Sequence, residues 1–332
     1  MKQIKDIDYV FLSSRIKAME GGLLSKERVE RMLDAPTNED AAKILVECGY
    51  PELSEVTGDA LEAALTEQQK RTMADLGNLA PDGTVVDVFK LRYDYHNAKV
   101  LVKAEALGID QNHLLVWGGR YAPDRMAEEY SREKLKDCSE FLRRGVARAR
   151  EVLGATGDPQ IADFALDRAY FEELSVMAQS TGCKFLAGYA ALLIDVANLR
   201  AMVRVSRLNK GTEFLKQVLV PGGNVSERTL ANVRGDELSS VFHYGVLVEA
   251  AAEGAAKSAP GSGSLTEFER LCDDAVMSYL AGARMVPFGP ETIVGYLYAR
   301  EAEATVIRTI MSGRMAGLSS ETIRQRLRRT YE

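Results

Sequence analysis

The sequence predicts an all-α protein, and three observations lead to this prediction. Alanine, leucine, glutamate and arginine, which favour helices, are abundant among the 332 residues, whereas there are only nine prolines. Apolar residues recur three and four positions apart, as in Val29, Met32 and Leu33. Strict apolar–polar alternation over five or more residues, which would indicate strands, is scarce.

Composition and charge exclude several classes of function. The chain has 42 Lys and Arg residues against 48 Asp and Glu, a formal net charge of −6. We therefore expect no nucleic-acid binding, which needs a basic face. The four cysteines form no CxxC pair and indicate a reduced cytoplasmic compartment. No secretory signal is apparent, and the most apolar segment, residues 185–199, contains Asp195 and is too short for a membrane span.

Short signals predict where helices begin. Thr66 and Thr266 each precede a Gln or Glu by three residues, which is the spacing of a capping box. Asp158 precedes a proline suited to the first helical turn. A glycine turn followed by a cap residue or a proline predicts four more starts, after Gly22, Gly119, Gly223 and Gly317.

One ten-residue pattern occurs twice, 101 residues apart. An eroded third copy lies at residues 300–308, with Glu303 at the place of the asparagine. Together with the glycine turns, the copies predict three similar helical modules, with approximate bounds 1–118, 119–222 and 223–332. The polar members of the two full copies are Asp94, Asn97, Lys99 and Lys103, and Asp195, Asn198, Arg200 and Arg204.

The repeated acids and amides share one side of their helix. At about 100° per residue, Asp94, Asn97 and Leu101 fall on one stripe, and Lys99 and Lys103 lie nearly opposite. An acid and an amide that face a core must be hydrogen-bonded, because an unpaired buried polar group costs roughly 1–3 kcal/mol. Backbone N–H groups of the Gly-Gly turns are natural partners.

We therefore interpret five residues as structural locks of the modules. Catalytic acids are the alternative for the two aspartates, but a pattern that recurs in each module suits architecture better than a single active site. The basic residues also have two interpretations: solvated helix faces, or a shared concave surface for an acidic partner if the modules surround an axis. The locks are Asp94, Asn97, Asp195, Asn198 and Glu303, and the candidate partner-facing basic residues are Lys99, Lys103, Arg200 and Arg204.

Recognisable catalytic motifs are absent from the sequence. The three histidines are isolated, and there is no phosphate-binding GxxxxGK[ST] loop and no GxSxG elbow. Two carboxylate pairs, Asp273 with Asp274 and Glu301 with Glu303, could hold a divalent metal, but the spaced DDxxD pattern of the helical prenyl-diphosphate enzymes is missing. We expect no catalytic residue, no cofactor and no metal site.

Four segments, in the same order along the chain, resemble signatures of the C subunit of V/A-type ATPases (A-type ATP synthases), a relative of the d subunit of the eukaryotic V-ATPase. The first segment reads YVFLSSRIKAMEGGLL at residues 9–24, and the others lie at residues 93–99, 194–200 and 296–310. The resemblance covers essentially the whole chain. It implies a pseudo-threefold, all-helical funnel that has no active site of its own.

The same resemblance implies partners. The wide mouth of the funnel would receive the D and F subunits of the central shaft, and the other end would sit on the cytoplasmic face of the membrane rotor ring, without spanning the membrane. The first hypothesis is thus a rotor socket for ATP-linked proton or sodium transport. Two alternatives stay open, a solenoid-type adaptor of another assembly and an all-helical metal-dependent enzyme.

Overall fold

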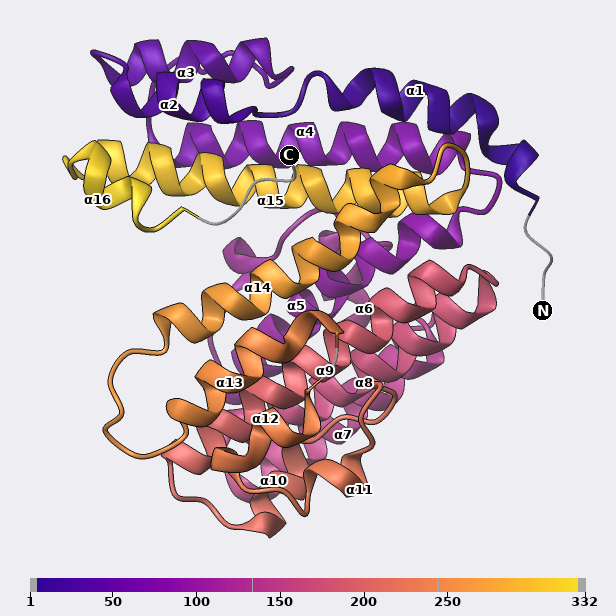
Figure 1. Cartoon of the computed structure of the whole chain (residues 1–332). Helices are drawn as coiled ribbons and strands as arrows, with labels where there is room; N and C mark the ends of the chain where they lie inside the picture. Colours follow the sequence, from indigo (N-terminus) through magenta and orange to yellow (C-terminus); the bar gives the residue numbers. More distant parts are fainter. Residues whose placement is uncertain (1–4, 133, 244, 328–332) are drawn as a thin grey trace. The chain divides into compact units, whose positions relative to one another are not determined.

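The computed structural model describes residues 5–132, 134–243 and 245–327, and every regular element in these ranges is helical (Figure 1). The all-α prediction is confirmed. The α-helices are α1 (Val10–Glu20), α2 (Lys26–Asp34), α3 (Asn38–Glu47), α4 (Gly58–Leu79), α5 (Thr84–Leu107), α6 (Pro123–Ser131), α7 (Glu140–Thr156), α8 (Pro159–Ser180), α9 (Lys184–Arg207), α10 (Thr212–Val218), α11 (Glu227–Leu230), α12 (Leu238–Val241), α13 (Val248–Ala256), α14 (Thr266–Ala281), α15 (Pro290–Met315) and α16 (Ser320–Arg324). Short 3₁₀ helices are η1 (Asp6–Tyr9), η2 (Asn112–Leu114), η3 (Gly235–Glu237), η4 (Gly245–Leu247) and η5 (Gly282–Met285).

The chain divides into two compact units. The first contains Asp87–Tyr279, and the second combines Lys5–Val86 with the chain from Leu280 onwards. The first and last helices of the chain therefore belong to one unit. The three continuous modules and the pseudo-threefold funnel stay predictions.

Helix α9 is the central core helix of the first unit. It contacts α8, α10 and α13, and Leu186, Ile194 and Leu199 are completely buried. Within the described residues, it is the one helix that is long and apolar enough to cross a membrane by length and composition. It is longer than the segment 185–199 because it continues through Arg207. Since 61% of its most apolar window is buried inside the protein, burial in a core accounts for its composition.

In the second unit, the last long helix packs against the first helices of the chain. Helix α15 contacts α1, α2, α3, α4 and α16. Its apolar side chains form one cluster with those of α2 and α3. The completely or almost completely buried members of this cluster include Met32, Leu33, Leu45, Ile307, Ile310, Met311 and Ile323.

Most of the predicted helix starts are confirmed. Ser25, Ser226 and Ser319 each accept a hydrogen bond from the backbone N–H three residues further on, at 3.1–3.2 Å. Asp158 accepts from the N–H of Gln160 at 2.9 Å and precedes α8. Helix α6 begins at its proline, and α14 begins at the threonine of the predicted capping box.

The start predicted at Thr66 is wrong. Helix α4 already begins at Gly58, and Thr57 caps it by accepting from the N–H of Ala60 at 3.2 Å. The buried stripe of Leu61 and Leu65 continues beyond the capping-box sequence, at Met73 and Leu76. Because the helix is already formed and packed there, Thr66 is an interior residue.

Candidate functional site

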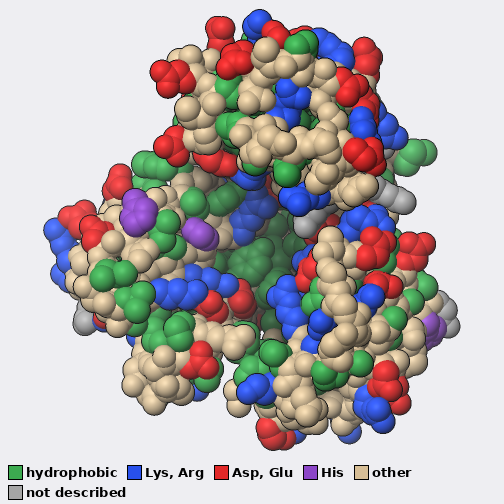
Figure 2. Space-filling view, turned by 90° about the vertical axis from the view of Figure 1, so that its left-hand side faces the viewer, with side chains coloured by type: hydrophobic (Ala, Val, Ile, Leu, Met, Phe, Trp, Pro, Cys, Tyr) green, Lys and Arg blue, Asp and Glu red, His purple; other side chains and the backbone are tan. Residues whose placement is uncertain are grey.

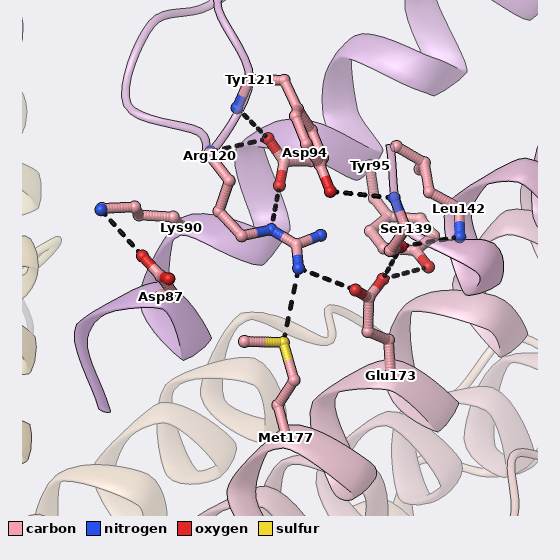
Figure 3. Close-up of polar contacts among 10 residues, drawn as sticks. All are labelled: Asp87, Lys90, Asp94, Tyr95, Arg120, Tyr121, Ser139, Leu142, Glu173 and Met177. Atoms are coloured by element: carbon pink, nitrogen blue, oxygen red, sulfur yellow. Dashed lines mark hydrogen bonds and ion pairs between the residues drawn. The ribbon is translucent and has the colours of Figure 1, made fainter. Parts of the chain in front are cut away.

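The carboxylate of Asp94 binds the loop that follows its own helix (Figure 3). It is completely buried, and its Oδ1 accepts from the backbone N–H groups of Arg120 at 2.9 Å and of Tyr121 at 3.3 Å. The Nε–H of Arg120 donates to Oδ2 at 2.7 Å. The two loop N–H groups precede α6 and have no helical partners of their own. One side chain thus fixes the connection between α5 and α6.

Asn97, one helical turn further on, clamps the same connection. Its Nδ2 donates to the carbonyl oxygen of Val116 at 2.9 Å, and its Oδ1 accepts from the N–H of Val116 at 2.8 Å. The side-chain amide therefore satisfies both backbone polar groups of Val116, its N–H and its carbonyl oxygen. A buried amide satisfied in this way carries little free-energy penalty.

The second copy repeats this geometry. Asp195 accepts from the N–H of Asn224 at 3.0 Å, from its Nδ2 at 2.8 Å and from the N–H of Val225 at 3.1 Å. Asn198 exchanges two hydrogen bonds with Val220, both at 2.8 Å. In both copies, the residue after the Gly-Gly pair gives the aspartate a backbone donor and a side-chain donor.

The Gly-Gly pair makes room for the aspartate. The first glycine has a left-handed backbone, with φ of 110° at Gly118 and 102° at Gly222. At the second glycine, a Cβ atom would overlap the Asp carboxylate: it would lie 3.2 Å from Cγ of Asp94 at Gly119, and 3.1 Å from Cγ of Asp195 at Gly223, with Oδ1 closer still. The first glycine is needed for the turn and the second for the close approach.

The third copy uses different residues and a loop from the other end of the chain. Glu303 of α15 accepts from the N–H of Leu24 at 2.7 Å and from the hydroxyl of Tyr50 at 2.9 Å. Arg300, which stands where the other copies have aspartate, donates to Glu303 at 2.6 Å, and its guanidinium lies over the Tyr50 ring. Leu24 follows the Gly21-Gly22 turn. In the third copy, the loop equivalent to those after the Gly-Gly pairs of the first two copies is thus supplied by the N-terminal segment.

The first copy has an additional buried network around Glu173 of α8 (Figure 3). Glu173 is 2% exposed and accepts from Arg120 Nη1 at 2.7 Å, from the Tyr95 hydroxyl at 2.9 Å and from Ser139 Oγ at 2.9 Å. Sequence reasoning missed Arg120 and Glu173. The signal for Arg120 was its place directly after a repeated Gly-Gly pair, whereas Glu173 has no counterpart in the repeat.

Burial raises the pKa of Asp94 to about 6, and the Arg120 guanidinium and the loop N–H groups oppose this shift. A carboxyl with a raised folded-state pKa contributes stability below its unfolded pKa, near 4, and this contribution is lost as the pH rises through 6. We expect the free energy of unfolding of the wild type, relative to Asp94→Asn, to fall by up to about 3 kcal/mol between pH 4 and pH 6.5. Urea unfolding of both proteins across this range measures the difference. A difference that is constant or that grows with pH would contradict the raised pKa.

The four candidate partner-facing basic residues pair with acids on a neighbouring helix of the first unit. Lys99 and Lys103 of α5 lie 2.6 and 2.7 Å from acids of α8, and Arg200 and Arg204 of α9 lie 2.7–2.8 Å from acids of α14. Acidic and basic side chains are likewise interspersed on the face shown in Figure 2. The acidic partners are Asp167 and Asp163 on α8, and Asp273 and Glu269 on α14.

These ion pairs are partly exposed, with side-chain exposures between 24% and 59%, so each contributes little to stability. The third copy has a similar pair, in which Arg308 of α15 lies 2.5 Å from Glu62 of α4. The basic residues thus connect long helices within the chain. A role in contacting a partner stays a prediction.

Three of the four carboxylates considered as metal ligands contact arginines. Asp273 pairs with Arg200, Asp274 with Arg270, and Glu303 with Arg300. Over residues 5–132, 134–243 and 245–327, no group of three or more His, Cys, Asp or Glu side chains is arranged to hold a metal ion.

Comparison with known proteins finds one family across nearly the whole chain. The family model described as ATP synthase (C/AC39) subunit matches residues 12–326. The chain is similar to the C subunit of the V-type sodium ATPase of Enterococcus hirae, with 23% identity over 98% of this chain and 100% of the relative. It is also similar to the C subunit of the V-type ATP synthase of Thermus thermophilus, with 26% identity over 94% and 95%, and to the C subunit of the A-type ATP synthase of Haloquadratum walsbyi, with 24% identity over 95% and 96%.

Proposed function

Because the chain belongs to the family of ATP synthase C/AC39 subunits, we propose that it is the central-stalk rotor subunit of a V/A-type ATPase or ATP synthase. In this role it is a non-catalytic socket between the D–F shaft and the membrane rotor ring, on the cytoplasmic face of the membrane. It passes torque between ATP hydrolysis or synthesis and ion transport. The match over residues 12–326 is the observation that carries this proposal.

The polar locks support a mechanical role. A part that transmits torque must resist shear between its helices, and packed cores with satisfied polar networks are stiff. In each copy, a buried side chain of a long helix holds the loop that precedes a short helix: Asp94 holds the loop before α6, Asp195 the loop before α11, and Glu303 the loop before α2. A load on the long helix is therefore passed to the short helix through hydrogen bonds as well as apolar packing.

The proposed shaft contact can be tested with the purified chain and a purified D–F complex. We expect wild type to bind, and Arg200→Glu with Arg204→Glu to weaken binding roughly tenfold or more, because the reversed charges repel an acidic partner. Isothermal titration calorimetry measures the affinity. This change also breaks the pairs with Glu269 and Asp273.

A matched control separates the two effects. Glu269→Gln with Asp273→Asn removes the same internal pairs but keeps both arginines, so this variant should bind the D–F complex at least as tightly as wild type. If wild type does not bind, the rotor-socket function is wrong. If the charge-reversed variant binds like wild type, the basic surface is wrong and the socket has another contact.

A further inference from the structure

The end of each long repeated helix has a common register. A residue with a left-handed backbone follows the helix, with φ of 64° at Gly108, 50° at Asn209 and 71° at Gly317. A short helix begins within the next four residues in each case: η2, α10 or α16. Six residues after the left-handed position, each copy has one apolar side chain, which we call the anchor. The anchors are Leu114, Leu215 and Ile323.

In the third copy, the anchor is fully packed. Ile323 of α16 is 1% exposed and lies against the α15 backbone, so that a Cβ at Gly313 would be 2.8 Å from its Cγ1. The next residue, Arg324, pairs with Glu30 of α2 at 2.7 Å. One apolar side chain and one basic side chain thus fix this short helix on the end of α15 and on α2.

The second copy has the same arrangement in weaker form. Leu215 of α10 is 8% exposed. It lines a hollow of about 400 Å³ at the end of α9, together with Met202 and Val205. The short helix therefore covers most, but not all, of the equivalent surface.

In the first copy, this surface is open. The short helix is reduced to the single turn η2, and its anchor, Leu114, is 46% exposed. At the end of α5, a hollow of about 650 Å³ is lined by Leu101, Ala104 and Leu115, and by Ile109, which is itself 49% exposed.

The rim of this hollow is acidic. Asp110, Asp124 and Glu128 line it and are exposed. In the described part of the chain, neither aspartate takes part in an ion pair, and Glu128 pairs at 2.7 Å with Arg132, the residue that follows α6. The basic residue of the lining, Arg150, is already paired with Glu105 at 2.5 Å. An apolar floor with an uncompensated acidic rim fits a segment that carries apolar and basic side chains.

We propose that the hollow beside α5 and α6 binds a short basic amphipathic helix from another subunit of the complex. An apolar side chain of this incoming helix enters the hollow, and Lys or Arg side chains of the same helix face Asp110 and Asp124. The incoming helix supplies what Ile323 and Arg324 supply within the third copy. This inference rests on the proposed function, because it needs an assembled complex.

Photo-crosslinking in the purified complex tests the contact. A benzophenone amino acid at position 109, which lines the hollow, should crosslink to a segment of another subunit that is helical, net basic and apolar on one face. Mass spectrometry of the joined peptides identifies this segment. The same amino acid at Val176, which is 51% exposed on α8 of the same unit, is the control for nonspecific capture and should not crosslink to that segment.

A second comparison tests the charges. Asp110→Asn with Asp124→Asn keeps the side-chain shapes and should lower the crosslink yield roughly fivefold. Glu52→Gln with Glu55→Gln removes two exposed charges from the other unit and should leave it unchanged.

Four outcomes overturn the inference: a crosslink to a second copy of this chain, a crosslink to an acidic segment, no crosslink in an intact complex, or a yield that both charge variants leave unchanged. These outcomes leave the proposed function standing, since the chain has joined the complex in each. If the wild-type chain does not assemble with the other subunits, the proposed function itself fails, and this inference with it.

Discussion

Replacing Arg120 by methionine is expected to lower the free energy of unfolding by about 3–5 kcal/mol, because it leaves two buried carboxylates without their cation. Arg120 donates to Asp94 and Glu173, both at 2.7 Å, and these carboxylates are 0% and 2% exposed. Methionine preserves most of the apolar volume of the arginine side chain. The decrease in the free energy of unfolding therefore reports the contribution of the charge and of its hydrogen bonds. Urea unfolding followed by circular dichroism gives the change.

Two comparisons separate this effect from that of an ordinary surface pair. Arg143 pairs with Glu140 at side-chain exposures of 43% and 64%, so Arg143→Met should cost less than about 0.5 kcal/mol. Because Asp94 is protonated in acid, the cost of Arg120→Met should be smaller at pH 5 than at pH 7.5. A loss below about 1 kcal/mol at neutral pH would show that the network around Arg120 does not hold this unit together.

Gly223→Ala is expected to destabilise the protein by about 2–4 kcal/mol, although it adds a single methyl group. The new Cβ overlaps the carboxylate of Asp195, which is 2% exposed, and meets Cγ2 of Ile194 at 3.3 Å. Neither neighbour has room to move, so the loop must shift and the hydrogen bonds from Asn224 and Val225 lengthen. The midpoint of thermal unfolding should fall accordingly.

Gly154→Ala is the matched control, with an expected effect of the opposite sign. Gly154 lies inside α7, and a Cβ there meets no atom within 4 Å. Alanine should stabilise the helix by roughly 0.5–1 kcal/mol. Equal effects of the two substitutions would mean that the close approach to Asp195 is not what requires a glycine at position 223.

Much of the fold could be predicted from local signals. Helix type and most helix starts follow from periodicity and caps, because a Ser or Asp cap interacts only with its own first turn. The repeat also placed Asp94, Asn97 and their second-copy equivalents on buried stripes, since helical geometry alone fixes which residues share a face. Thr66 shows the limit, because an identical local signal inside a longer packed helix has no effect.

The partners of the buried side chains could not be predicted in the same way. Glu173 is connected to Asp94 through Arg120, and no spacing in the sequence predicts this connection. Two partners of Glu303, Leu24 and Tyr50, lie more than 250 residues before it in the sequence. Such contacts depend on how distant helices pack, which a pattern read along one segment does not contain.

The pairing of the first and last helices in one unit sets the order in which this protein can mature. Met32, Leu33 and Leu45 are translated long before the α15 side chains that cover them. During synthesis the N-terminal helices therefore keep an apolar face uncovered, which makes the nascent chain a natural client for chaperones. Removal of α15 would therefore expose the apolar side chains of α2 and α3 that it covers.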